Sequence, residues 1–243
     1  MRLLFIFILV SCTIVHAQTH TGGKTVNLSR QSNDTTITQD PSDPKTQHVV
    51  VKNEKDIVIS RGDYVKGKKS GIWREYTDLG VLTKLAEYRG GQLDGAYVAF
   101  NRSGQVMEDA SYASDSLDGL RLTMNNNRVK SMENYSNGML HGQRKTYYDD
   151  GKLQEESNYN MGQRDGVTTW YLQSGKPSLQ YTYINGVIQG PAKEFNEDGS
   201  VKREGSFKNN TEDGEWNVYQ DSSLVKKIIY KEGTIVKEVP VKK

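Results

Sequence analysis

Side chains suited to catalysis or metal binding are few and widely separated in the sequence. A chain cleaved before Gln18 keeps three histidines, His20, His48 and His141, and no cysteine. Catalysis by proton transfer or nucleophilic attack needs such groups within hydrogen-bonding distance of one another, and a zinc site needs several ligands at short spacings. Neither such a spacing nor a complete phosphate-binding loop or Gly-x-Ser-x-Gly motif is present. The sequence therefore predicts a protein that is not an enzyme and has no metal ion or cofactor.

Aromatic side chains are the other group with binding chemistry, because flat rings stack on sugars and bases. Most of them recur at a fixed spacing along the chain, which favours a structural role as cross-strand pairs. A binding patch is expected instead where the repetition breaks. On that ground the candidate binding surface consists of Trp170 with Tyr171 and of the adjacent pair Tyr147 and Tyr148.

The elements that must position these residues come from a unit of about 24 residues that repeats from Tyr64 to Glu238. Each copy opens with an aromatic anchor, at Tyr64, Tyr88, Tyr112, Tyr135, Tyr159, Tyr183, Phe207 and Tyr230. A glycine follows seven residues after the first seven anchors, at Gly71, Gly95, Gly119, Gly142, Gly166, Gly190 and Gly214. Another large residue comes five positions later, at Tyr76, Phe100, Met124, Tyr147, Tyr171, Phe195 and Tyr219. A period of this length is typical of stacked repeat architectures.

Asn-Gly and Asp-Gly pairs divide each copy into short segments. Pairs such as Asn137-Gly138, Asp150-Gly151 and Asp165-Gly166 supply the positive φ that tight hairpin turns require. His141 stands where other copies have this aspartate, so we expect it to be a turn residue. The segments between these pairs have the length of strands and are rich in Tyr, Val and Thr. We therefore expect an all-β fold, an elongated single-sheet antiparallel meander of stacked β-hairpins.

Two details of the repeat predict local irregularity. Trp73 and Tyr76 are three residues apart, so they lie on opposite faces of the sheet unless a bulge intervenes. The third copy has Asp115 in place of a glycine and Arg121 at the position of Trp73. We expect a kink or a loose edge in that copy.

Tryptophan returns at the position of Trp73 only in the last full copy, at Trp216. The other copies have Tyr97, Arg121, Arg144, Thr168 and Ala192 there. A repeated aromatic cage for quaternary ammonium ligands, as in the hairpin modules that bind choline, is therefore not expected.

The first residues have the features of an export signal. A basic residue precedes the apolar run 3–10, and a small-residue cleavage site ends at Ala17. We predict a signal peptide at 1–17, which makes the protein periplasmic, outer-membrane-associated or extracellular. The alternative is a lipid on Cys12, because Leu9-Val10-Ser11-Cys12 resembles a bacterial lipobox.

Three further segments follow the signal. Residues 18–47 are polar and contain Pro41 and Pro44, so we predict a flexible polar tether. Residues 48–63 have two β-branched runs around a polar turn, which predicts a degenerate capping hairpin. The repeat array is expected over 64–243.

The composition limits the classes of partner. Hydrophobic residues make up 35% of the chain, which is low for a thick core and suits a thin sheet with a wet face. The 32 Lys and Arg nearly balance the 30 Asp and Glu. No strong electrostatic field favours a nucleic acid or a membrane surface, so we expect neither, apart from a membrane contact through a lipid on Cys12.

The repeated residues resemble a known family. Gly71-Ile72-Trp73, Tyr76, Gly80-Val81-Leu82, Tyr88 and Gly91 are similar to the variant MORN (membrane occupation and recognition nexus) repeat. The bacterial, antitoxin-type form is the most similar. The resemblance implies an elongated sheet of hairpins, a role in binding or scaffolding, and no catalytic residues.

These observations predict an exported, non-catalytic repeat protein that binds or scaffolds an unidentified protein partner at the cell envelope. One alternative is an envelope protein that binds a cell-wall glycan through exposed aromatic residues. Another is an antitoxin-type protein that binds and neutralises a protein toxin.

Overall fold

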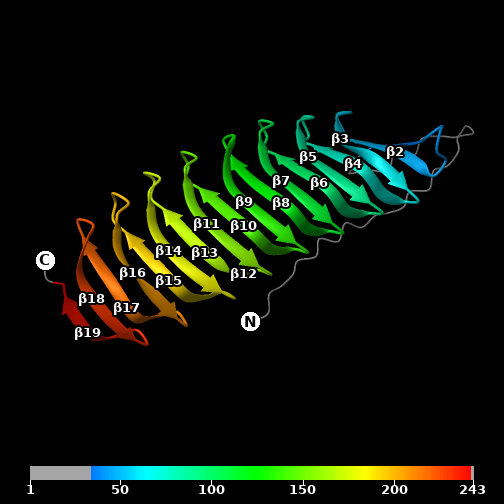
Figure 1. Ribbon diagram of the computed structural model, residues 1–243. Coiled ribbons are helices and arrows are strands. Elements are labelled where there is room, and N and C mark those ends of the chain that lie inside the picture. The colour runs from blue at the N-terminus through cyan, green and yellow to red at the C-terminus, as the bar shows by residue number, and fades with distance from the viewer. Residues whose placement is uncertain (1–33, 242–243) are drawn as a thin grey trace, which may run out of the picture. The chain divides into compact units, whose positions relative to one another are not determined.

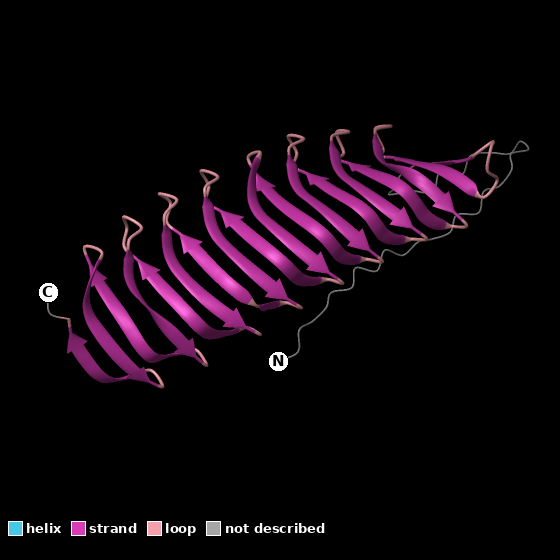
Figure 2. Cartoon of the chain, viewed as in Figure 1, coloured by secondary structure: helices cyan, strands magenta, loops and turns pink. Residues whose placement is uncertain are grey.

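The computed structural model describes residues 34–241, which form one sheet of 19 β-strands (Figures 1 and 2). In chain order they are β1 (Asp34–Gln39), β2 (Thr46–Lys52), β3 (Val58–Val65), β4 (Lys68–Tyr76), β5 (Leu82–Arg89), β6 (Gln92–Phe100), β7 (Val106–Ala113), β8 (Ser116–Asn125), β9 (Arg128–Ser136), β10 (Met139–Tyr147), β11 (Leu153–Asn160), β12 (Gln163–Arg164), β13 (Gly166–Tyr171), β14 (Pro177–Ile184), β15 (Val187–Phe195), β16 (Val201–Lys208), β17 (Thr211–Gln220), β18 (Ser223–Lys231) and β19 (Thr234–Pro240). Among these residues there is no helix long and apolar enough to cross a membrane. The predicted signal peptide, Cys12 and the first part of the predicted tether lie outside the described residues.

Each strand pairs antiparallel with the next one along the chain, and β12 and β13 share one position beside β11. The strands therefore lie side by side in sequence order, as the colour gradient of Figure 1 shows. The predicted all-β antiparallel meander is confirmed.

Two kinds of turn alternate along the two long edges of the sheet (Figure 2). At one edge, Asn137 and Gly138 have φ of 50° and 78° and form a two-residue hairpin turn between β9 and β10. At the other edge, the amide of Gly80 donates to the carbonyl oxygen of Thr77 at 3.0 Å, and the amide of Thr77 donates to the carbonyl oxygen of Val81 at 2.7 Å. Both kinds match the turn residues of the sequence.

The glycine seven residues after each anchor does not form a turn. Gly95 has φ of 126° and lies inside β6, next to a shift of register with β5. Asp165 interrupts one strand, between β12 and β13, and His141 is an exposed residue inside β10. The predictions of turns at Asp165-Gly166 and His141 were wrong, because a bulge uses the same positive φ as a turn.

The sheet is a single layer, and one of its faces is far drier than the other. Side chains alternate between the two faces along each strand. Trp73 and Trp216 are 2% and 0% exposed, whereas Ile72, next to Trp73 in the sequence, is 50% exposed. We call the face that carries these tryptophans the aromatic face and the other one the opposite face. The aromatic face is the core of the protein.

Each buried tryptophan covers a glycine of the preceding strand. A methyl group added at Gly205 would overlap the ring of Trp216, and one at Gly62 would overlap the ring of Trp73. The indole nitrogen of Trp216 donates to the carbonyl oxygen of Ser206 at 3.1 Å, which fixes the ring in this position. The large ring can lie flat on the sheet only because the residue beneath it has no side chain.

Aromatic rings extend this packing across the C-terminal strands. Successive ring centroids are 5.3–6.1 Å apart along the chain of contacts Trp170, Tyr181, Phe207, Trp216 and Tyr230. Ala192, Ile228 and Val218 fill the space beside these rings. Edge-to-face contacts of this kind stabilise beyond the area they bury, by roughly 0.5–1.5 kcal/mol per pair.

A bulge does occur beside Tyr76, but it lies in the neighbouring strand. Glu75 pairs with Lys84 and Tyr76 pairs with Leu82, so the extra residue is in β5. Tyr76 therefore stays on the opposite face. The equivalent Tyr219 donates its hydroxyl to Glu204 at 2.7 Å, and Glu204 is next to Gly205 and so faces away from Trp216.

The predicted tether is wrong from residue 34 on, because β1 pairs along its whole length with β2. All residues of β1 are exposed, so the strand gains its stability from backbone hydrogen bonds rather than from a core. Its turn is closed by Asp40, whose carboxylate accepts hydrogen bonds from the amide and hydroxyl of Ser42, both at 2.7 Å. The predicted hairpin at 48–63 exists as β2 and β3, but β1 covers its outer edge.

His48 joins this N-terminal hairpin to β3. Its Nδ1 lies 2.7 Å from Asp63 and its Nε2 lies 3.3 Å from Asp40. The hydrogen bond to Asp63, followed by the charges of both carboxylates, raises the pKa of His48 above its ordinary value of 6.5. The imidazole, whose protonated form these carboxylates favour, therefore links the turn after β1 to the body of the sheet.

Adding a methyl group beneath a tryptophan should destabilise the sheet. We expect Gly205→Ala to lower the free energy of unfolding by about 2 kcal/mol, because the ring of Trp216 has to shift. The measurement is denaturant unfolding of the single variant, of Trp216→Leu and of the double variant. The two changes should be strongly non-additive, since Trp216→Leu removes the clash. Additive costs would show that the two residues do not oppose each other.

The N-terminal hairpin should loosen as the pH rises. A raised pKa means that the stabilisation from His48 is complete below pH 6.5 and is lost as the pH rises through the folded-state pKa. Hydrogen exchange of the β1 and β2 amides, corrected for the intrinsic effect of pH, should show less protection at pH 8 than at pH 6. His48→Gln should lack this difference. Equal pH dependence in both proteins would contradict the role of His48.

Candidate functional site

Six charged residues form a continuous ladder in the middle of the aromatic face. We call it the ion ladder; its members are Glu108, Arg121, Glu133, Arg144, Glu155 and Arg164. Each contact joins an arginine to a glutamate, at distances of 2.6, 2.9, 3.1, 3.3 and 2.6 Å in that order. The ladder occupies the part of the face where the tryptophan position holds arginine.

Most polar groups of the ion ladder find their partners within it, although Arg164 Nε is buried without a hydrogen-bond partner among the described residues. The carboxylates of Glu133 and Glu155 are only 10% and 13% exposed. Burial lowers the pKa of Arg121, but hydrogen bonds to Glu108 and Glu133 outweigh this and raise the pKa overall. Three positive and three negative groups cancel, so the ladder offers no net charge to a ligand. Its role is to hold the central strands together where arginine replaces the tryptophan of the other copies.

The ladder also explains the regularity of the third copy. The expected kink is absent, and β8 pairs with β9 from Gly119 to Asn125 with the same single shift of register that the other copies have. Arg121 replaces ring packing by ion pairs, and Asp115 accepts a hydrogen bond from the amide of Leu93 at 2.8 Å. The prediction of a kink or loose edge was wrong because these charged side chains bond across strands.

The four aromatic residues predicted as a binding surface do not lie together. Trp170 is on the aromatic face, where its indole nitrogen donates to Glu155 at 3.1 Å and its ring packs on Tyr181. Tyr171 and Tyr147 follow the pattern of Tyr76 and lie on the opposite face. Trp170 is therefore separated from Tyr171 by the sheet itself.

Tyr148 lies in the turn after β10 and belongs to the contact between neighbouring hairpins. Its hydroxyl donates to the carbonyl oxygen of Tyr171 at 2.6 Å. Tyr147, Tyr148 and Tyr171 are all partly buried rather than exposed. The structure brings Tyr148 and Tyr171 together, but as a link between two copies of the repeat.

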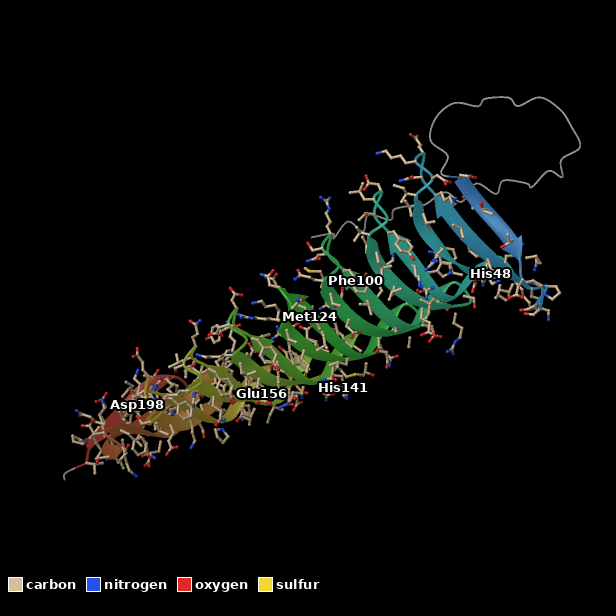
Figure 3. The ribbon with its side chains drawn as sticks, turned by 90° about the horizontal axis from the view of Figure 1, so that it is seen from above. His48, Phe100, Met124, His141, Glu156 and Asp198 are labelled. Carbon is tan, nitrogen blue, oxygen red and sulfur yellow. The ribbon has the colours of Figure 1, made fainter. Side chains whose placement is uncertain are left out.

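The opposite face has a row of residues in register across the sheet. One of them, Glu156, is labelled in Figure 3. We call this row the central row; from β3 to β18 it reads Arg61, Arg74, Leu85, Val98, Asp109, Leu122, Met132, Lys145, Glu156, Thr169, Gln180, Lys193, Glu204, Asn217 and Lys227. Its C-terminal half is polar. Lys145 and Lys193 form ion pairs with Glu156 and Glu204.

The N-terminal half of this row breaks the symmetry of the repeat, because it contains four apolar side chains beside the two arginines and Asp109. We define the apolar sector as Leu85, Val98, Leu122 and Met132 of the central row with the flanking residues Ile72 and Leu120. Ile72 and Leu120 are 50% and 41% exposed. Asp109 lies between Val98 and Leu122, is exposed, and makes no ion pair or side-chain hydrogen bond within residues 34–241. Sequence reasoning missed this sector because it searched for aromatic residues rather than aliphatic ones.

A shallow hollow of about 370 Å³ adjoins the apolar sector at its N-terminal end. Its lining includes His48, Arg61, Asp63, Ile72 and Arg74. Arg61 and Arg74 are directly opposite each other on β3 and β4. The sector and this hollow form one continuous surface over β3 to β9.

Metal-binding chemistry is not evident on the described part of the chain. No group of three or more His, Cys, Asp or Glu side chains there is arranged to hold an ion. His141 is exposed on β10 and approaches no acidic cluster.

The fold and these surfaces define a β-hairpin repeat protein with a dry face and a wet face. Residues 140–161, 164–185 and 188–209 match the family described as the MORN repeat variant. Each match covers one hairpin, formed by β10–β11, β12–β14 and β15–β16 respectively. The chain thus contains variant MORN repeats. No curated protein matches the chain.

MORN repeats are generally associated with the binding of proteins or membranes, and the family is generally non-catalytic. The match is to the variant repeat as such and does not distinguish an antitoxin-type form.

Breaking the ion ladder should lower the free energy of unfolding far more than breaking an exposed ion pair does. We expect Glu133→Gln to lower the free energy of unfolding by about 3 kcal/mol, because it leaves Arg121 and Arg144 half-buried without their shared partner. The matched control is Glu215→Gln, whose carboxylate is 48% exposed and pairs with Lys227. That change should cost less than about 1 kcal/mol. Equal costs, measured by denaturant unfolding, would contradict a structural role for the ladder.

Proposed function

We propose that the protein is a non-catalytic scaffold that binds a protein partner through the apolar sector of the opposite face. The observation that carries this proposal is the break in repeat symmetry. In the central row, the C-terminal copies have paired charges, whereas β5, β6, β8 and β9 present apolar side chains. Exposure of Ile72 and Leu120 to water does not stabilise the sheet by itself, whereas a partner that covers them would bury apolar surface.

The stacked hairpins suit such a role. Because the copies form a rigid series, contacts spread over several strands act together without rearrangement of the protein. Burial of a large aliphatic side chain contributes roughly 1.5–3 kcal/mol, so a few such residues are enough for specific binding. The association of MORN repeats with protein binding supports the same conclusion.

We place this activity at the cell envelope, after export by the predicted signal peptide at 1–17 or with a lipid on Cys12. A cell-wall glycan is the second candidate ligand, but Trp170 is already engaged by Glu155 and Tyr181. Neutralisation of a toxin is a special case of protein binding, and it requires a toxin in the same compartment.

The test compares two substitutions at the same position of the repeat. Leu120 and Val167 each come directly after the glycine that follows the anchor by seven residues. Both lie on the opposite face, and they are 41% and 45% exposed. Leu120 is in the apolar sector and Val167 is not. The full chain, Leu120→Glu and Val167→Glu serve as baits against envelope extract of the source organism.

We expect one protein to be retained by the wild type and by Val167→Glu, with at least about tenfold less on Leu120→Glu. Retention that is equal on all three baits would contradict binding through the apolar sector. Retention on insoluble wall polysaccharide, with no protein captured, would favour the glycan instead. The N-terminal peptide of the chain isolated from its source distinguishes cleavage before Gln18 from a lipid on Cys12.

A further inference from the structure

The arginines beside the apolar sector are placed against the usual rules of sheet stability. Arg61 and Arg74 are directly opposite each other on neighbouring strands of the same face. Like charges in this position destabilise a sheet. Neither arginine forms a salt bridge anywhere in residues 34–241, although Arg61 lies 5.8 Å from the ring centroid of Tyr76.

The other basic residues of the central row behave differently. Lys145 pairs with Glu156 at 3.2 Å, Lys193 with Glu204 at 3.0 Å, and Lys227 with Glu215 at 2.7 Å. Within the described residues, each of these lysines therefore has an acidic partner, whereas neither arginine has one.

The carboxylate that lines the hollow is already engaged by His48 and forms no salt bridge with either arginine. Asp63 lines the same hollow as Arg61 and Arg74, but its oxygen is held by His48 at 2.7 Å. The two guanidinium groups thus share the hollow with one carboxylate, which His48 already holds. The hollow has an excess of positive charge and ten N–H donors on the two guanidiniums, which suit a planar carboxylate.

We infer that the protein partner places a carboxylate side chain between Arg61 and Arg74 while its apolar residues cover the sector. This inference rests on the proposed function and states the chemistry of the segment that binds. The central row also predicts the orientation of the bound segment across the strands. Asp109, which has no partner of its own, is three strands from Arg74, or about 14 Å at the usual strand spacing. The bound segment therefore carries an acidic residue over β3 and β4, aliphatic or aromatic residues over β5 and β6, and a basic residue over β7.

The test uses a library of random 20-residue peptides displayed on phage and selected on the full chain. We expect enriched peptides to combine apolar residues with an acidic and a basic residue at a constant separation. One of these peptides, labelled with a fluorophore, is then titrated by anisotropy against the wild type and the variants. Arg61→Gln with Arg74→Gln should weaken binding at least about tenfold, and Asp109→Asn should weaken it as well. Lys193→Gln, in the same row but ion-paired, should leave the Kd unchanged.

Folding of the arginine variant provides an internal check. Removal of a like-charged pair should leave the thermal midpoint unchanged or raised, so a loss of binding is not a loss of structure. Peptides that bind equally well to the arginine variant, or that show no acidic preference, overturn the inference. If Leu120→Glu still abolishes their binding, the proposed function survives on its own.

Peptides whose Kd is unaffected by Leu120→Glu and by the arginine substitutions overturn the inference and the proposed function together. A library that yields no binder does the same. Vesicles of phosphatidylglycerol test the other source of an anionic group. Arginine-dependent binding to these vesicles, with no binding to peptides, would assign the hollow to a lipid and overturn the peptide assignment.

Discussion

The whole structure depends on one constraint: a single-layer sheet must bury its side chains against one another on the same face. Within residues 34–241 no second layer covers the aromatic face, so a large side chain can be buried only where its cross-strand neighbour is small. Trp216 covers Gly205, and Trp73 covers Gly62. Where the tryptophan position is occupied by Thr168 or Ala192, the residue between them across the sheet is the large Tyr181. The sizes of neighbouring residues compensate, and the face stays closed.

The ion ladder is a second solution to the same problem. In the central copies, neighbouring side chains match in charge rather than in size, because arginine and glutamate alternate from strand to strand. The long stems of these side chains still cover the sheet, and their heads satisfy one another. Two regions of ring packing are thus joined by a polar one. The opposite face, free of this constraint, can vary from copy to copy, and it is where the apolar sector and the arginine pair are found.

Much of the fold could be predicted from the sequence, because the period, the strand lengths and the Asn-Gly turns act locally. The bulges at Gly95 and Gly166 could not be separated from turns, since both need the same backbone conformation. β1 was missed because backbone pairing alone holds it, which leaves no hydrophobic pattern to detect. The candidate aromatic residues shared a neighbourhood in sequence but not a face. Comparing the tryptophan position with the residue two before each anchor would have found the glycine partners and the contact of Glu133 with the two arginines beside it.

The strict meander has a consequence for how such a chain comes into being. Every strand bonds only to strands adjacent in sequence, so most of the contacts close short loops, and no element waits for a distant part of the chain. A sheet of this kind can grow from whichever hairpin forms first, and whole copies can be gained or lost by duplication or deletion without redesign of the rest. Length is therefore an evolutionary variable that is separate from the chemistry of any one surface, and a binding surface can arise in a few copies while the others merely extend the sheet.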